Sequence, residues 1–252
     1  MSSTRIIPVL LLLGAGLNKT RQFEPWKYLG DPVNAVRIFN EKEVDELAIL
    51  DIRATLEGRA PPFHEVERIA SEAFMPIAYG GGVRGVDDVR RLLAGGVEKV
   101  ILNSILHDDI TVLDKAAAAF GSQSLVASID VRRQPSGGWR VFTRSGTLDT
   151  GEDVIDVAKR AVAAGAGELL LTSIDREGTR KGFDLELIDR VARAVDVPVI
   201  AHGGAGELAD IRKAVAQGAS AVAAGSLFVL IGKLDAVLIS YPSATELGSA
   251  TP

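Results

Sequence analysis

Met75-Pro76-Ile77-Ala78-Tyr79-Gly80-Gly81-Gly82 is matched 122 residues later by Val197-Pro198-Val199-Ile200-Ala201-His202-Gly203-Gly204. The same offset relates further positions outside these stretches, namely Asp88 to Asp210, Gly96 to Gly218 and Ser104 to Ser226. An offset of about half the chain indicates two similar halves, each built from the same supersecondary units.

Short apolar runs alternate with amphipathic segments along the whole chain. The eight runs that we expect to be strands are Ile6–Leu11, Glu46–Asp51, Pro76–Ala78, Lys99–Leu102, Leu125–Asp130, Glu168–Thr172, Pro198–Ala201 and Ala221–Ala224. The clearest predicted helices are Val86–Ala94, Asp153–Ala164, Leu185–Ala194 and Leu208–Ala216, which end near glycines that favour helix termination. This pattern predicts the α/β class and a single (β/α)8 TIM barrel with a half-barrel internal repeat. A doubly wound open sheet is the alternative, although it usually has fewer strands at this length.

The predicted domain covers residues 1–252, with half-barrels at about 1–122 and 123–240 and a flexible tail at 241–252. The tail follows from the small and polar residues of Ser240–Pro252. One insertion, Arg132–Thr150, contains Gly137-Gly138 and alternating apolar residues, which predict a small hairpin.

Composition narrows the possible functions. The net charge of −5 and the pI of about 5.3 argue against a nucleic-acid partner. The chain has no cysteine, and its histidines lie far apart at positions 64, 107 and 202, so we expect no metal site and no cofactor. The apolar run Ile6–Leu13 is too short to span a bilayer and fits a signal peptide poorly, because Pro8 interrupts it. We expect a cytoplasmic protein without a membrane partner.

Glycine pairs and hydroxyl or amide side chains follow the predicted strands in both halves. At the carboxyl ends of barrel strands, such residues form phosphate sites from backbone N–H groups and helix N-termini. The sequence therefore predicts two cradles on opposite sides of the barrel mouth. The first contains Gly81, Gly82, Asn103 and Ser104, and the second contains Gly178, Gly203, Gly204, Gly225 and Ser226.

Carboxylates also end three of the predicted strands or follow them. Asp51, Asp130 and Asp175 are candidates for acid–base catalysis, and each could instead be a helix cap or an ion-pair partner. Superposing the two halves places Leu11 opposite Asp130. Two such carboxylates could divide acid and base roles, but a leucine cannot transfer a proton.

Several motifs together resemble the cyclase subunit of imidazole glycerol phosphate synthase, the HisF family, over nearly the whole chain. They are Arg5-Ile6-Ile7-Pro8, Gly30-Asp31-Pro32, Gly80-Gly81-Gly82-Val83-Arg84, Phe120-Gly121-Ser122-Gln123, Leu171-Thr172-Ser173 and Gly203-Gly204-Ala205-Gly206. The resemblance implies that a glutaminase subunit docks at the bottom of the barrel. It further implies that ammonia passes through the barrel to a substrate with two phosphates at the top.

The resemblance also assigns residue roles. A ring of charged residues that gates ammonia matches Arg5, Glu46, Lys99 and Glu168, and a catalytic lysine matches Lys19. The ring could equally be a structural plug of salt bridges.

The sequence departs from the family where the chemistry is expected. Leu11 stands in place of the first catalytic aspartate, the family's Asp-Arg-Asp-Gly-Thr loop reads Asp175-Arg176-Glu177-Gly178-Thr179, and His202 replaces a serine. These changes are similar to a divergent branch that takes part in glycan biosynthesis with a glutaminase and a sugar amidotransferase.

Three functions are compatible with these features. The chain is an ammonia-delivering synthase subunit of a glycan-amidation system, a working cyclase of histidine biosynthesis, or a phosphate-binding scaffold without chemistry. Leu11 disfavours the second, because losing a positioned acid or base typically costs roughly 10²–10⁴-fold in rate. The charge ring and the paired cradles disfavour the third.

Overall fold

The computed structural model describes residues 4–232, 234–243 and 245–246, and it contains all eight predicted strands. They are β1 (Arg5–Leu13), β4 (Leu47–Asp51), β5 (Ile77–Gly80), β6 (Lys99–Leu102), β7 (Leu125–Arg133), β10 (Glu168–Ser173), β11 (Val199–His202) and β12 (Ala221–Ala224). Each strand pairs in parallel with the next, β7 pairs with β10, and β12 pairs with β1. The sheet therefore closes, which confirms the (β/α)8 barrel and excludes the open sheet.

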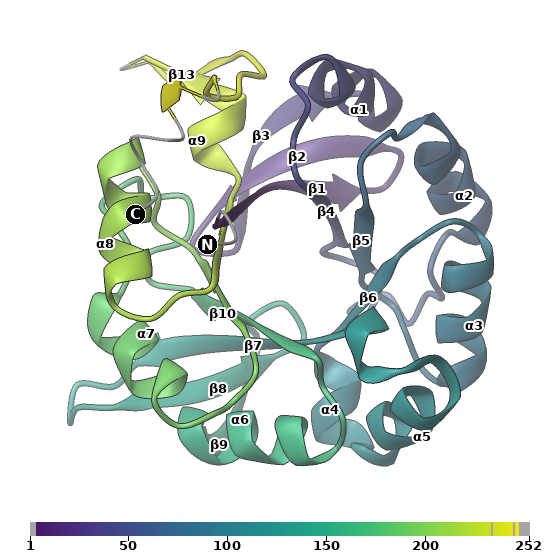
Figure 1. Ribbon diagram of the computed structural model, residues 1–252, viewed down its shortest axis with the longest axis vertical. Coiled ribbons are helices and arrows are strands. Elements are labelled where there is room, and N and C mark those ends of the chain that lie inside the picture. The colour runs from purple at the N-terminus through teal and green to yellow at the C-terminus, as the bar shows by residue number, and fades with distance from the viewer. Residues whose placement is uncertain (1–3, 233, 244, 247–252) are drawn as a thin grey trace.

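The helices form an outer ring around the barrel in the view down its axis (Figure 1). They are α1 (Pro32–Glu41), α2 (Phe63–Glu72), α3 (Val86–Ala94), α4 (Ser104–Asp108), α5 (Thr111–Phe120), α6 (Val154–Ala163), α7 (Leu185–Ala192), α8 (Leu208–Ala216) and α9 (Ser226–Val229). Local chemistry explains where they begin: Asp31 caps α1 by accepting from Asn34 N, and Asp153 caps α6 by accepting from Ile155 N. The four helices predicted most clearly agree with α3, α6, α7 and α8.

Two apolar cores follow from the alternation of side chains along each strand. On β1, Ile6, Leu10 and Leu12 belong to the core between the strands and the helices. Their neighbours Ile7, Val9 and Leu11 belong to a second core inside the barrel. The apolar run at the N-terminus is thus a barrel strand with both faces buried.

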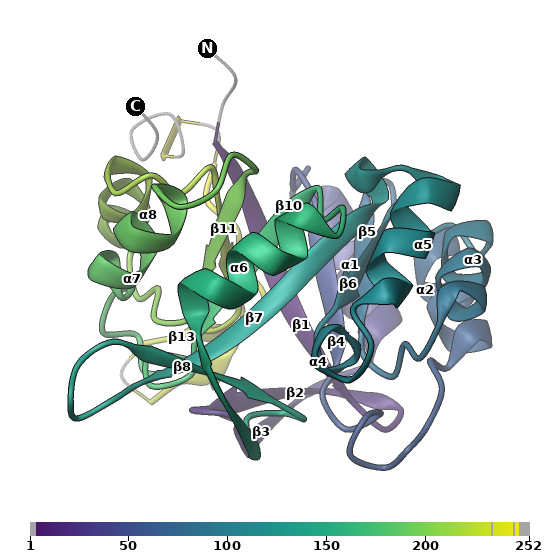
Figure 2. The same ribbon diagram turned by 90° about the horizontal axis from the view of Figure 1, so that it is seen from below.

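Two hairpins extend from the carboxyl ends of the barrel strands. The predicted one is present as β8 (Trp139–Thr143) and β9 (Leu148–Asp153), which continue the sheet beyond the end of β7. The second, β2 (Gly16–Arg21) and β3 (Glu24–Gly30), was not predicted, and it pairs with the end of β1 through Leu11–Leu13. In the side view both hairpins lie at the same end of the barrel (Figure 2).

The end of the chain is partly packed. A short two-stranded sheet, β13 (Leu230–Ile231) and β14 (Ala236–Val237), precedes it. The Tyr241 hydroxyl then donates to the carbonyl oxygen of Ile6 at 3.0 Å, and the Tyr241 ring lies 5.2 Å from that of Phe228. The tail predicted to be flexible therefore has an anchored first residue, while residues 244 and 247–252 lie outside the described part. None of the described helices is long and apolar enough to cross a membrane.

Candidate functional site

The four predicted ring residues form a closed circuit of ion pairs at the amino ends of the strands. Arg5 Nη1 lies 2.6 Å from Glu46 Oε2, and Arg5 Nη2 lies 2.5 Å from Glu168 Oε1. Lys99 Nζ completes the circuit at 2.9 Å from Glu46 and 3.1 Å from Glu168. Each charge therefore has two opposite partners, so the ring closes this end of the barrel without an unpaired charge.

Above the ring, the interior of the barrel is apolar. The inward side chains that fill it are Ile7, Val9, Ala48, Ala78, Ile101, Val126, Leu170, Ile200, Ala221 and Ala223. Several of them are small, and none carries a charge. An ion would lose its hydration in such a passage, whereas a small neutral molecule would lose much less.

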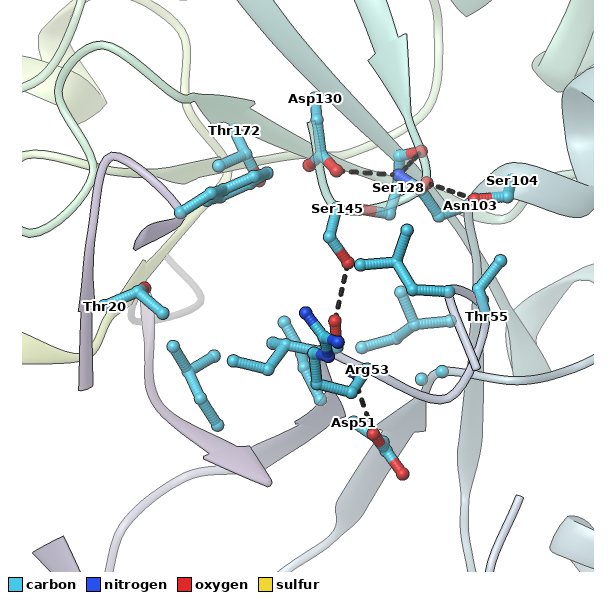
Figure 3. A pocket seen from close by; sticks show the side chains of 18 of the residues that line it. Thr20, Asp51, Arg53, Thr55, Asn103, Ser104, Ser128, Asp130, Ser145 and Thr172 are labelled. Atoms are coloured by element: carbon cyan, nitrogen blue, oxygen red, sulfur yellow. Dashed lines mark hydrogen bonds between the residues drawn. The ribbon is translucent and has the colours of Figure 1, made fainter. Parts of the chain in front are cut away.

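A cavity of about 200 Å³ opens at the carboxyl ends of the strands, and Asp130 lies in its wall. Asn103 Nδ2 donates to Asp130 Oδ2 at 3.0 Å (Figure 3). Burial raises the pKa of Asp130 to about 7, although hydrogen bonds from Thr172 and Asn103 act in the opposite direction. A carboxyl group with a pKa near neutrality can both take up and release a proton, as acid–base catalysis requires.

Leu11 lines the same cavity, as the internal repeat predicts. Its side chain is buried, and it pairs with Leu50 of β4 and Asn18 of β2. The end of β1 therefore presents an apolar surface to the cavity.

Lys19 is buried and bound to a carboxylate that sequence analysis did not select. Its Nζ forms an ion pair with Glu177, and it also donates to the carbonyl oxygen of Thr20 at 2.8 Å. Burial lowers the pKa of Lys19, although Glu177 favours the charged form. The hydroxyl of Thr20 and the backbone N–H of Phe23 also donate to Glu177, at 2.9 and 3.2 Å. Glu177 thus binds the β2–β3 hairpin to the loop that follows β10 at the barrel mouth.

The structure does not bring the predicted Asp175 into the cavity. Its carboxylate accepts from the backbone N–H of Arg133 at 2.8 Å, and its side chain is 40% exposed. Glu177, two residues later, is the acidic residue of this loop that lines the cavity. The loop turns after β10, so the carboxylate of Asp175 faces the end of β7 at Arg132 and Arg133.

Asp51 lines the cavity, but local bonds already occupy its carboxylate. Its Oδ1 accepts from the backbone N–H groups of Arg53 and Ala54, at 3.1 and 3.0 Å (Figure 3). Arg59 Nη1 lies 3.2 Å from Oδ2. The ion pair is one of the two alternatives that the sequence left open for Asp51; the other, a helix cap, is replaced by a cap on the turn that follows β4.

The residues of the two predicted cradles gather in two separate pockets beside the cavity. Gly81, Gly82, Asn103 and Ser104 line a pocket of about 110 Å³ next to Arg59 and Arg84. The residues of the second cradle line a pocket of about 10 Å³ together with Lys19, Glu177 and His202. The buried Oγ of Ser226 has no hydrogen-bond partner among the described residues, so it is a donor without an acceptor in this pocket.

Replacing Ser226 by alanine tests the second cradle. We expect weaker phosphate binding by about three- to tenfold, since one neutral hydrogen bond contributes roughly 0.5–1.5 kcal/mol. Thermal stability should stay unchanged because the hydroxyl has no protein partner to lose. Calorimetric titration with inorganic phosphate measures the first effect. Ser104→Ala is the matched variant at the first cradle, where the Ser104 hydroxyl accepts from Arg144 N, so it should also lower stability. Unchanged phosphate affinity in Ser226→Ala would remove this residue from the cradle.

Gly204 is unsuitable for the same test. It has a φ of +115°, and a Cβ there would lie 2.2 Å from the carbonyl oxygen of Gly182. A side chain at this position would distort the loop itself rather than only occupy the space of an anion.

Three residues of the site were not among the predicted ones. Thr172 lines the cavity, and Glu177 and His202 line both the cavity and the second cradle. Sequence carried signals for them, because His202 breaks the glycine pattern at the position that corresponds to Gly80, Glu177 departs from the family's loop, and Thr172 lies in a family motif. Among the described residues, no group of three or more histidine and acidic side chains could hold a metal ion.

Known proteins resemble this chain over most of its length. The profile of the family described as "Histidine biosynthesis protein" matches residues 5–235. A Pseudomonas aeruginosa protein, provisionally named imidazole glycerol phosphate synthase subunit hisF2, is 48% identical over 98% of this chain and 99% of its own. The imidazole glycerol phosphate synthase subunit HisF of Metallosphaera sedula is 46% identical over 90% of this chain and 91% of its own.

Proposed function

The chain belongs to the histidine biosynthesis protein family, and from this premise we propose that it is the HisF-like synthase subunit of a glutamine-dependent amidotransferase. In this proposal a HisH-like glutaminase docks at the amino ends of the strands and releases ammonia there. Ammonia crosses the barrel and reacts at the carboxyl ends with a phosphorylated small molecule. The reaction amidates a sugar in glycan synthesis, with a sugar amidotransferase as a further partner.

One observation carries the proposal: the charge ring and the catalytic cavity lie at opposite ends of an apolar interior. A neutral nucleophile entering at Lys99 would pass apolar side chains before it reaches the cavity that holds Asp130. This path keeps ammonia unprotonated and therefore nucleophilic. The ring would have to open at one ion pair to admit it, and Lys99 is the member with the most flexible side chain.

Asp130 is the group that we assign to proton transfer. Ammonia must lose protons when it adds to an electrophilic carbon, and a carboxylate with a raised pKa can accept one of them. The two glycine cradles flank the cavity and would hold the phosphates of the substrate. Lys19 would contribute only after it leaves Glu177, because the ion pair now occupies it.

Leu11 supports a substrate other than that of histidine biosynthesis. If the cyclase reaction needs carboxylates on β1 and β7, this chain offers only the second. The cyclase of histidine biosynthesis is the second candidate. The retained Asp130, both cradles and the relatives named as HisF subunits favour it.

Turnover of the two-phosphate cyclase substrate, with ammonium supplied, distinguishes these candidates. We expect little or no turnover in the wild type and a measurable gain in Leu11→Asp, because Asp130 and both cradles stay in place. Burial of the new carboxylate beside Val9 should lower stability by a few kcal/mol, about the cost of an unpaired polar group. Leu11→Asn is the control of similar shape that cannot act as a base. Strong wild-type turnover would contradict the glycan assignment and support the cyclase.

The glutaminase partner is tested separately by mixing. We expect the purified chain to co-elute with its glutaminase at micromolar concentration and to raise glutaminase activity. Separate elution with unchanged glutaminase activity would refute the partner.

A further inference from the structure

Three inward-facing side chains stand in a row on neighbouring strands at the barrel mouth. Thr172 of β10 pairs in register with Asp130 of β7 on one side and with His202 of β11 on the other. Thr172 Oγ1 lies 3.1 Å from His202 Nδ1, and the Thr172 hydroxyl acts on its other neighbour by lowering the pKa of the Asp130 carboxyl. A hydroxyl has one donor and two acceptor positions, so Thr172 can accept from the imidazole and donate to the carboxylate at the same time.

His202 stands where the catalytic cavity meets the second phosphate cradle. It lines both pockets, and its ring is buried. Nδ1 is directed to Thr172, and within residues 4–232, 234–243 and 245–246 the structure gives Nε2 no hydrogen-bond partner. This nitrogen is therefore available to a ligand that occupies either pocket.

We propose that Asp130, Thr172 and His202 form a proton-transfer row in which His202 is the second acid–base group of the site. The inference rests on the proposed function, since it adds a residue to the same site. In this arrangement both groups of the acid–base pair, Asp130 and His202, belong to the second half of the barrel. The first half cannot supply one of them at position 11, because Leu11 carries no proton-transferring group.

The transfer is balanced in protons. A proton from the ligand binds Nε2 of His202, and the proton on Nδ1 moves to the oxygen of Thr172. The hydroxyl proton of Thr172 then passes to Asp130. His202 ends neutral in its other tautomer, Asp130 ends as a carboxylic acid, and the reverse sequence restores both.

The electrostatic surroundings suit these roles. Burial lowers the pKa of His202 to about 4, so its ring is neutral at physiological pH and carries one N–H and one lone pair. The charged groups that act on the ring are Glu177, which raises this pKa, and Lys19, which lowers it. Asp130 lies beyond Thr172 and populates both protonation states near neutral pH.

The position of the row defines the class of substrate. Its His202 end borders the second cradle, and its Asp130 end lies in the wall of the cavity. The fitting ligand is a phosphate ester whose phosphate sits in the second cradle and whose reacting atom lies near Asp130. The proton is then moved along the length of the substrate inside the closed site.

Nuclear magnetic resonance of the chain alone tests the row, with labelled histidine nitrogens and aspartate carboxyl carbons. We expect the His202 nitrogen signals to shift with the same midpoint as the Asp130 carboxyl, near pH 7. Thr172→Ser keeps the hydroxyl and should keep this common midpoint. Thr172→Val keeps the shape but removes the hydroxyl, and the shift of His202 at that midpoint should disappear. His64 and His107 serve as internal references in every sample.

A second arm uses inorganic phosphate as the probe of the cradle. Phosphate should shift the Asp130 carboxyl signal in the wild type and in Thr172→Ser, and not in Thr172→Val. Asp130→Asn removes the titrating carboxyl itself, so the shift of the His202 nitrogen signals near pH 7 must also disappear in this variant. It tests the row without Thr172→Val if the valine variant fails to fold. Independent titration of His202 and Asp130 in the wild type would overturn the row. Coupled titration in a chain that forms no complex with a glutaminase would instead refute the proposed function and leave the row standing.

Discussion

Glu177→Gln is expected to lower the free energy of unfolding by about 3–5 kcal/mol, the usual cost of leaving one charge of a buried pair alone. Lys19 is 3% exposed, and Glu177 is its carboxylate partner. The carboxylate also accepts from Thr20 and Phe23, so the variant loosens the whole β2–β3 hairpin. Denaturant unfolding measures the loss, and faster hydrogen exchange in residues 16–30 locates it.

Two controls separate the ion pair from other effects of this loop. The double variant Lys19→Met/Glu177→Gln removes both charges, so it should recover most of the lost stability. Asp175→Asn lies in the same loop, but its side chain is 40% exposed and its asparagine can still accept from Arg133 N, so stability should change by less than about 1 kcal/mol. A loss in the double variant equal to that in Glu177→Gln would show that the pair itself contributes little.

Asp130→Asn is expected to reduce ammonia-dependent turnover by roughly 10²–10⁴-fold, because asparagine cannot accept a proton. Asparagine has nearly the same shape and can still accept from Asn103, so the cavity should stay intact. The assay uses saturating ammonium and whichever phosphorylated substrate the wild type converts. Turnover within tenfold of the wild type would exclude Asp130 as the acid–base group.

The same variant should be more stable than the wild type above neutral pH. In the native state the pKa of Asp130 is raised to about 7 from 3.8, so between these values the native state holds a proton that the unfolded chain has released. The unfolding free energy contributed by Asp130 therefore falls as pH rises through this window. At about 1.4 kcal/mol per pKa unit the difference reaches about 4 kcal/mol by pH 8.

Comparing unfolding of wild type and variant at pH 4, 6 and 8 tests this sign. His202 has the opposite effect, because its lowered pKa removes stability as pH falls from about 6.5 to about 4. It contributes in both proteins, so the difference between them isolates Asp130. A difference that does not change with pH would show that Asp130 keeps an ordinary pKa.

The barrel could be predicted because each strand is marked by a local apolar run and the halves repeat each other. The ring residues were assigned from the family resemblance, and strand pattern then placed them together, since Glu46 and Lys99 stand at the first positions of apolar runs and the amino ends of parallel strands meet. Register then fixes which side chains face inward. Strand register predicts the direction of side chains only within the strands.

Beyond the strand ends, the direction of a side chain depends on loop geometry that no periodicity encodes. Asp175 and Glu177 differ by two positions in one loop, and the turn after β10 places only Glu177 in the cavity. The β2–β3 hairpin was missed because Gly14-Ala15-Gly16 reads as a loop and the strands after it lack a clear alternation. Its position depends on the contacts with Glu177, which come from a segment about 155 residues away in the sequence.

The broken symmetry of the repeat has a consequence for mutational tolerance. At equivalent positions the first half carries Leu11 and Gly80, and the second half carries Asp130 and His202. In a barrel made of two similar halves, one half can lose reactive side chains and keep only a structural role, while the other half keeps the acid–base groups. Random substitutions that preserve folding should therefore be accepted more often at the strand ends of residues 1–122 than at those of residues 123–240. New substrates would then arise most readily by changing the strand ends of the first half, which shape the site, while Asp130 and His202 stay in the second half.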